Sequence, residues 1–106
     1  PSNKGGGTLA KGSLTVLGSP LELLGAPQPD GPVSAYIRPE DIVYGSGPIS
    51  GTVITTSFLG SLRRTRVLLD DGTLLSVQHD VSDKPETGKT AKLSLRGRPV
   101  SAERIA

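Results

Sequence analysis

The segment Gly88-Lys89-Thr90 is the part of the sequence closest to a phosphate-binding loop. The complete motif has another glycine five positions before Gly88, and a helix follows it whose amino terminus faces the phosphate. Position 83 is aspartate instead, and the residues after Thr90 alternate between apolar and polar, as in a β-strand. The sequence therefore predicts a turn that leads into a strand, and no nucleotide site.

His79 is the single histidine of the chain and the first residue to consider for a metal site or for catalysis. A zinc site normally takes three or four protein ligands. Asp80 and Asp83 are near His79 in sequence, but the chain has no cysteine and no second histidine. A catalytic triad cannot readily be built either, because the chain has several serines but only one histidine and no cysteine. The adjacent carboxylates of Asp70 and Asp71 fall in a predicted turn. We therefore expect no metal, no catalytic residues and no enzyme activity in this chain.

Arginine is the main basic residue, and it is concentrated in two short stretches: Arg63, Arg64 and Arg66, and Arg96 and Arg98. Proteins that bind single-stranded nucleic acid usually combine such charge with aromatic side chains on which bases stack. This chain has three aromatic residues, and only Phe58 is near the arginines in sequence. Solvated charges along a strand edge, which oppose edge-to-edge association, explain the arginines better. We expect no nucleic-acid partner.

The elements that position these residues are predicted to be short β-strands. Glycine occurs 14 times and proline 9 times in 106 residues, and no helical apolar period is sustained over three turns. With so few aromatic residues, the core must consist of Leu, Val and Ile. Apolar runs predict strands over 14–17, 21–24, 33–37, 49–59, 62–69, 73–79 and 91–95. Several short strands at this spacing predict a barrel or a sandwich.

Residues typical of turns separate these predicted strands. Asp70-Asp71-Gly72 predicts a hairpin turn, and Pro39-Glu40-Asp41-Ile42 predicts one helical turn, because proline suits a first helical position. Gly45-Ser46-Gly47-Pro48 predicts a break. Val100 and Ile105 are expected to pack a last short segment onto the sheet.

The domain organisation follows from composition. Residues 1–12 are rich in glycine and lysine, and we expect them to be a loosely ordered connector from an upstream domain; residues 13–106 form the domain itself. The sequence starts with proline, so we expect it to be part of a larger protein. The formal net charge of +2 demands no polyanionic partner. No apolar stretch suits a signal peptide or a membrane span, and the absence of cysteine fits the cytoplasm.

The segment Ala35–Ile42 resembles the signature of the TOBE (transport-associated OB) domain, a hydrophobic residue followed by any residue and Arg-Pro-Glu-Asp-Ile. Further similar stretches follow in order: Ser50-Gly51-Thr52-Val53, Phe58-Leu59-Gly60, the strand and hairpin of residues 66–72, and residues 88–93. Lys89 and Ala91 depart from the family pattern, which usually has an acid and a valine. The resemblance covers nearly the whole chain. It implies an all-β, OB-fold-like small barrel with an N-terminal group of short strands.

The resemblance also implies a place in transport. TOBE domains follow the nucleotide-binding domain in the ATPase subunits of importers for sugars, polyamines, sulfate and ferric iron. We therefore expect a non-catalytic, regulatory or dimer-stabilising C-terminal domain of an ABC importer ATPase subunit, at the inner face of the cell membrane. Its partners would be its own nucleotide-binding domain, a second copy of the subunit and the membrane permease. ATP and Mg would bind upstream, and this chain would hold no cofactor.

The matched residues receive structural or interface roles from the resemblance: Arg38, Pro39, Glu40, Asp41, Phe58, Leu59 and Gly60. Arg38 is expected to pair with a carboxylate or to cap carbonyls. Pro39 fixes the backbone, and Glu40 stabilises the turn that follows. We expect Phe58 and Leu59 to be buried and Gly60 to permit a sharp bend.

The alternative prediction is a small sensor domain that binds an oxyanion such as molybdate or sulfate. Related oxyanion-binding barrels hold their ligand with backbone N–H groups and with serine and lysine side chains. Ser50, Ser61 and Arg63 are the candidate donors here. No closely matching motif supports them.

Overall fold

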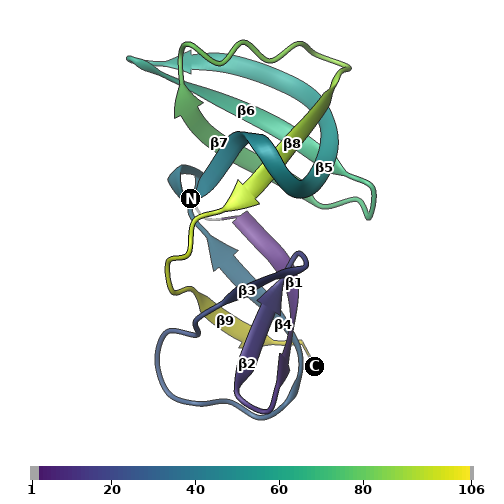
Figure 1. The fold of residues 1–106 in the computed structure, drawn as a ribbon, viewed down its shortest axis with the longest axis vertical. Helices are drawn as coiled ribbons and strands as arrows, with labels where there is room; N and C mark the ends of the chain where they lie inside the picture. Colours follow the sequence, from purple (N-terminus) through teal and green to yellow (C-terminus); the bar gives the residue numbers. More distant parts are fainter. Residues whose placement is uncertain (1–2, 106) are drawn as a thin grey trace.

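The protein, seen in a computed structural model that describes residues 3–105, consists of two β-sheets stacked end to end along its 40 Å long axis (Figure 1). The elements in chain order are β1 (Asn3–Ala10), β2 (Ser13–Val16), β3 (Ser19–Leu21), β4 (Gly31–Ile37), the 3₁₀ turn η1 (Pro39–Asp41), β5 (Ile42–Leu59), β6 (Leu62–Leu69), β7 (Leu74–Asp80), β8 (Thr90–Leu95) and β9 (Ser101–Arg104). The predicted all-β, OB-fold-like architecture is confirmed. The described residues contain no helix that is long and apolar enough to cross a membrane.

The first sheet has five strands in the order β3-β2-β1-β4-β9, and its neighbours pair antiparallel. β1 is its central strand, paired with β2 on one side and with β4 on the other. The prediction of a loosely ordered connector is therefore wrong for Asn3–Ala10; residues 1 and 2 lie outside the described part. The error has a local cause: the glycine-rich run has little strand propensity, and only pairing on both sides makes it a strand.

The second sheet has four strands in the order β7-β6-β5-β8 and curls into half a barrel (Figure 1). Its long strand β5 includes Gly45-Ser46-Gly47-Pro48, so the predicted break at this point is wrong. The register with β8 shifts there, between Tyr44 and Ile49, and this irregularity lets the strand bend without ending. Gly47 has a φ of 135°, and an added Cβ would lie 2.2 Å from the carbonyl oxygen of Leu93. Only glycine fits this position.

Two predicted turns are confirmed. Asp70-Asp71-Gly72 lies in the connection between β6 and β7, where the N–H of Gly72 donates to the carbonyl of Leu69. Pro39–Asp41 is a single 3₁₀ turn, with the proline at its start and acidic residues in its first turn. The turn carries the chain from the first sheet into the second, which places the predicted signature segment at the junction between them.

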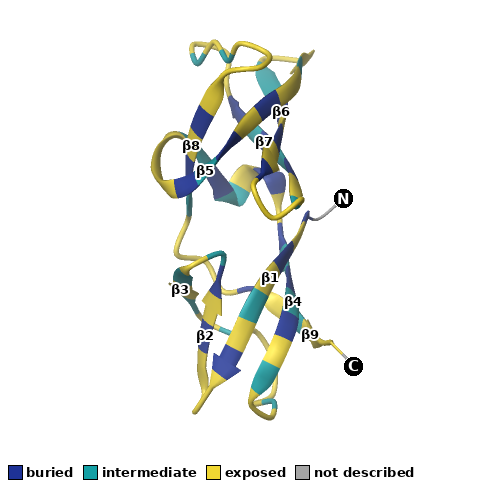
Figure 2. Ribbon diagram, turned by 90° about the vertical axis from the view of Figure 1, so that its right-hand side faces the viewer, coloured by how far each residue is buried: buried dark blue, intermediate teal, exposed yellow. Residues whose placement is uncertain are grey.

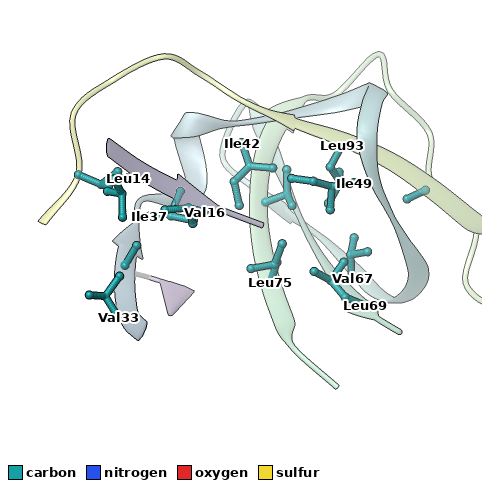
Figure 3. Packing of buried hydrophobic residues seen from close by; sticks show 14 of the residues in the cluster. Leu14, Val16, Val33, Ile37, Ile42, Ile49, Val67, Leu69, Leu75 and Leu93 are labelled. Atoms are coloured by element: carbon teal, nitrogen blue, oxygen red, sulfur yellow. The ribbon is translucent and has the colours of Figure 1, made fainter. Parts of the chain in front are cut away.

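The core is aliphatic, as the composition predicted. Buried and exposed residues alternate along most strands, so one face of each sheet is covered and the other faces water (Figure 2). Figure 3 shows side chains of both sheets in one cluster, with Ile37 and Val16 of the first and Ile42 and Leu75 of the second. No described aromatic side chain is fully buried. Polar contacts also join the sheets, since the side chain of Asn3 in β1 binds the backbone of Ser76 in β7.

Candidate ligand-binding surface

The outer face of the four-stranded sheet gathers the hydroxyl and basic side chains that alternate with the core. On β6, Thr65, Val67 and Leu69 are buried, so Arg64 and Arg66 point to the opposite side. The other strands add the following outward residues near them: Ser50, Thr52, Thr55 and Ser57 of β5, Ser76 and Gln78 of β7, and Thr90, Lys92 and Ser94 of β8. We call this set the outer face.

Strand register arranges part of this set in two neighbouring rows. Arg66 lies opposite Thr55 on one side and Ser76 on the other. Two residues along β6, Arg64 lies opposite Ser57 and Gln78, and its Nη2 donates to Gln78 Oε1 at 3.1 Å. Directly opposed residues have Cβ atoms about 5 Å apart. Each arginine is therefore flanked by a hydroxyl group within reach of the same small ligand.

The electrostatics of the outer face favour an anion. Its only carboxylate among the described strand residues is Asp80, at the end of β7 and opposite Leu62. The backbone N–H of Ser82 donates to Asp80, which lowers the pKa of that carboxyl group. Arg66 is exposed and takes part in no ion pair among the described residues. Arg64 is half-buried, and its Nε is covered by the protein, so only the outer part of its guanidinium can reach a ligand. Arg66 therefore offers the freest donors of the outer face to an external acceptor.

A second pair of polar side chains lies where β5 and β8 meet. Ser50 is opposite Lys92, and Thr52 is opposite Thr90. Lys92 is exposed and Ser50 is half-buried. Ser50 is thus the one predicted ligand-binding residue that belongs to the outer face.

The other two candidate donors are elsewhere. Ser61 is in the turn between β5 and β6, and Arg63 stacks on the ring of Phe58 with its guanidinium carbon 4.4 Å from the ring centroid. Arg63 lies opposite Phe58 and the buried His79, on the side of β6 away from Arg64. The structure therefore does not bring Ser50, Ser61 and Arg63 together. Alternation along β6 is the sequence signal that could have selected Arg64 and Arg66 instead.

His79 belongs to a buried hydrogen-bonded group on the inner side of the sheet. Its Nε2 is 2.6 Å from Thr65 Oγ1, and Thr65 Oγ1 is 3.1 Å from Thr56 Oγ1. The ring of Tyr44 stacks on His79 at 4.6 Å; its burial, and then the charge of Asp83, raise the pKa of the Tyr44 phenol. No group of three or more His, Cys, Asp or Glu residues in the described chain could hold a metal ion. The arrangement satisfies buried polar atoms and does not expose a nucleophile, since Thr65 is fully buried.

The signature residues Arg38, Glu40 and Asp41 line a pocket of about 290 Å³ at the junction of the sheets, together with Arg98. Arg98 pairs with Asp41 at 3.5 Å, and Arg96 Nε donates to the carbonyl of Glu40 at 3.0 Å. The side chain of Arg38 forms no capping hydrogen bond on η1. Opposite charges are balanced in this pocket, which makes it a weaker place for an anion than the outer face.

The prediction that Phe58 and Leu59 are buried is wrong. Phe58 is 68% exposed and Leu59 is 47% exposed. They end β5 at a turn that extends beyond the curled sheet, so no opposing strand covers them. The predicted sharp bend at Gly60 is present, with a φ of 63°.

Comparison with known proteins identifies the family of the chain and a solved structure with the same fold. The family model described as TOBE domain matches residues 35–101. No curated protein matches the sequence. Among solved structures, the chain is similar to one described as the cytoplasmic molybdate-binding protein ModG with molybdate bound, with a TM-score of 0.67, 15% sequence identity and 94% of each chain covered. At this identity the likeness shows the shared fold.

This likeness overturns the expected role as the C-terminal domain of an ABC importer ATPase subunit. The shared architecture covers 94% of the molybdate-binding chain, which leaves no room for an ATPase domain in that chain. The prediction from the signature was wrong because the signature marks the fold and not the protein that contains it. The expected ATPase, permease and membrane partners lose their basis with it.

Proposed function

This chain belongs to the TOBE domain family, and we propose that it is a binding protein for a small tetrahedral oxyanion of the molybdate and sulfate type. The observation that carries the proposal is the pair of rows on the outer face, where Arg64 and Arg66 lie between hydroxyl and amide side chains. The similar solved structure, described as a molybdate-binding protein, supports the same ligand class. The role is binding without catalysis and needs no cofactor.

The chemistry of the two rows suits such a ligand. A guanidinium group presents parallel N–H donors to two oxygen atoms of an oxyanion, and charge-assisted bonds of this kind are stronger than neutral ones. Thr55 and Ser57 add hydroxyl donors from the neighbouring strand. Because Arg66, Thr55 and Ser57 are exposed, salt screens the attraction and affinity falls as ionic strength rises. Ser50 and Lys92 offer a second, smaller set of donors on the same face.

The cellular setting that fits this role is the cytoplasm, the compartment named for the similar molybdate-binding protein. Oxyanion binding does not require the inner face of the membrane, where the ATPase assignment had placed the chain.

Thermal unfolding in the presence of molybdate, sulfate or phosphate tests the proposal. A ligand that binds only the folded state at 100 times its Kd adds about 2.7 kcal/mol to the free energy of unfolding, which raises the Tm by on the order of 10 °C in a domain of this size. Chloride at equal ionic strength is the control for general salt effects.

Two variants localise the site. Arg66→Gln should remove most of the stabilisation by the oxyanion, whereas Arg104→Gln, an exposed arginine of β9 in the other sheet, should leave it unchanged. If all three oxyanions act no differently from chloride, the proposal is wrong. Equal responses of the two variants would move the site away from the outer face.

A further inference from the structure

The pocket at the junction of the sheets is built by three chain segments that backbone hydrogen bonds hold together. These are the turn η1, the connection from β8 to β9, which runs from one sheet to the other (Figure 1), and the stretch that follows β3. The N–H of Arg96 donates to the carbonyl of Asp41 at 2.8 Å, and the N–H of Leu24 donates to the carbonyl of Val100 at 2.7 Å. Because each wall is fixed to its neighbour, the pocket does not need a ligand to form it.

The charged side chains of this pocket fall into one closed pair and two free groups. Two are positive, Arg38 and Arg98, and two are negative, Glu40 and Asp41. Arg98 and Asp41 pair with each other at 3.5 Å. Arg38 and Glu40 are exposed and take part in no ion pair among residues 3–105. The pocket therefore offers one positive and one negative group to a ligand.

This balance of charge disfavours a simple ion. An anion that approaches Arg38 also meets the carboxylate of Glu40, and a cation that approaches Glu40 also meets the guanidinium of Arg38. A molecule that carries both charges gains a charge-assisted hydrogen bond at each end. A free α-amino acid presents its carboxylate and its ammonium group from one carbon atom, so it can use both residues at once.

The remaining walls of the pocket are apolar and leave room for a small side chain. Leu24, which is 55% exposed, and Pro99 line it beside the charged residues. An aliphatic group that covers Leu24 removes apolar surface of both partners from water. The volume of about 290 Å³ is just below the usual range of ligand pockets, about 300–1,000 Å³, so it suits a small molecule.

We propose that this pocket binds a free α-amino acid with an aliphatic side chain, a second ligand beyond the oxyanion of the outer face. Arg38 donates parallel N–H groups to the carboxylate of the amino acid. Glu40 accepts from its ammonium group, and its aliphatic side chain packs on Leu24. The pair of Arg98 and Asp41 stays intact and joins two walls of the pocket.

Titration of the full chain with L-leucine, followed through backbone amide chemical shifts by NMR, tests the proposal. The shifts should change in the three segments that build the pocket, with a Kd on the order of 1 mM, because the contacts are few and exposed. N-acetyl-L-leucine lacks the ammonium charge and L-leucine methyl ester lacks the carboxylate, so each should bind at least about tenfold more weakly. Glycine lacks the aliphatic side chain and should also bind more weakly than leucine.

Substitution of the two free charges localises the site. Arg38→Gln and Glu40→Gln should each weaken leucine binding by about tenfold. Both residues are exposed, so both variants should fold, and thermal unfolding verifies this. Arg104→Gln and Glu86→Gln make the same changes at exposed positions outside the pocket and should leave the affinity for leucine unchanged.

Four outcomes contradict the proposal. Chemical shifts that do not respond to leucine, or that change only outside the three segments, show that the pocket does not bind it. Binding of N-acetyl-L-leucine as tight as that of leucine makes the pocket an anion site, and equally tight binding of the methyl ester makes it a cation site. Unchanged affinity in folded Arg38→Gln and Glu40→Gln shows that the two free charges do not hold the ligand.

Discussion

The side-chain amide of Asn3 pairs with the backbone of Ser76 in the way that one strand residue pairs with another. Asn3 Nδ2 donates to the carbonyl of Ser76 at 2.9 Å, and the N–H of Ser76 donates to Asn3 Oδ1 at 2.7 Å. β7 is an edge strand of its sheet, so these backbone groups have no strand partner on that side. One side chain of β1 thereby satisfies the edge and joins the two sheets.

Asn3→Ala should lower the free energy of unfolding by about 1–3 kcal/mol, because two hydrogen bonds are lost and the backbone groups of Ser76 are left partly buried. Chemical denaturation measures the change. Asn3→Asp keeps the acceptor oxygen but not the N–H donor and should lose part of this amount. Equal stability of Asn3→Ala and the unchanged protein would show that the sheets are held by their apolar contacts alone.

Gly47→Ala should destabilise the protein by about 3 kcal/mol or prevent folding. The position has a φ of 135°, and the new methyl group would meet the carbonyl of Leu93 at 2.2 Å. Gly6→Ala is the matched control, since it lies in a strand and an added Cβ there has no atom within 4 Å. That variant should gain about 0.4–1 kcal/mol from the reduced freedom of its unfolded chain. Loss of stability in Gly6→Ala and not in Gly47→Ala would contradict the described backbone of β5 at Gly47, where the register with β8 shifts.

Leu93→Ala should cost about 2–5 kcal/mol, because Leu93 is fully buried where β8 pairs with both halves of the bent β5. Leu74→Ala removes the same side chain from a position that is 39% exposed and should cost much less. Urea denaturation of both variants gives the comparison. Similar losses for the two would mean that the outer end of β7 is covered in solution.

Asp80 should make the stability pH-dependent in acid. The N–H of Ser82 donates to its carboxylate and lowers its pKa in the folded state below the ordinary value of about 3.9. The stabilisation is therefore complete above that ordinary value and is lost as the pH falls through the lowered pKa. The difference in Tm between the unchanged protein and Asp80→Ala should be largest near neutral pH and should shrink below about pH 4. A difference that grows in acid would have the wrong sign.

Local sequence patterns predicted most of the strands because alternation is a property of adjacent residues. Ala91, Leu93 and the polar residues between them identify β8 without reference to any other strand. The same kind of information failed at Asn3–Ala10, since this glycine-rich segment becomes a strand only through pairing on both sides. It also failed at Gly45-Ser46-Gly47-Pro48, where β5 continues through an irregularity in its register with β8. It failed at Phe58 because a residue's hydrophobicity does not tell whether any part of the chain covers it.

For the candidate binding surface too, the sequence predicted one part and strand pairing decided the rest. The alternative prediction from the sequence was oxyanion binding through Ser50, Ser61 and Arg63, and of these three residues only Ser50 lies on the outer face. Arg64 and Arg66 become candidates only when register brings them beside Thr55, Ser57, Ser76 and Gln78.

The sequence by itself determined the all-β fold, the positions of the main turns, the aliphatic core and the TOBE family. These depend on propensity, spacing and short motifs, which neighbouring residues carry among themselves. Only the tertiary structure decided which donors face one ligand, which edge Asn3 satisfies, and that Phe58 is exposed. Those relationships join residues as far apart as Asn3 and Ser76, and they arise because strand pairing and burial are set by the whole chain at once.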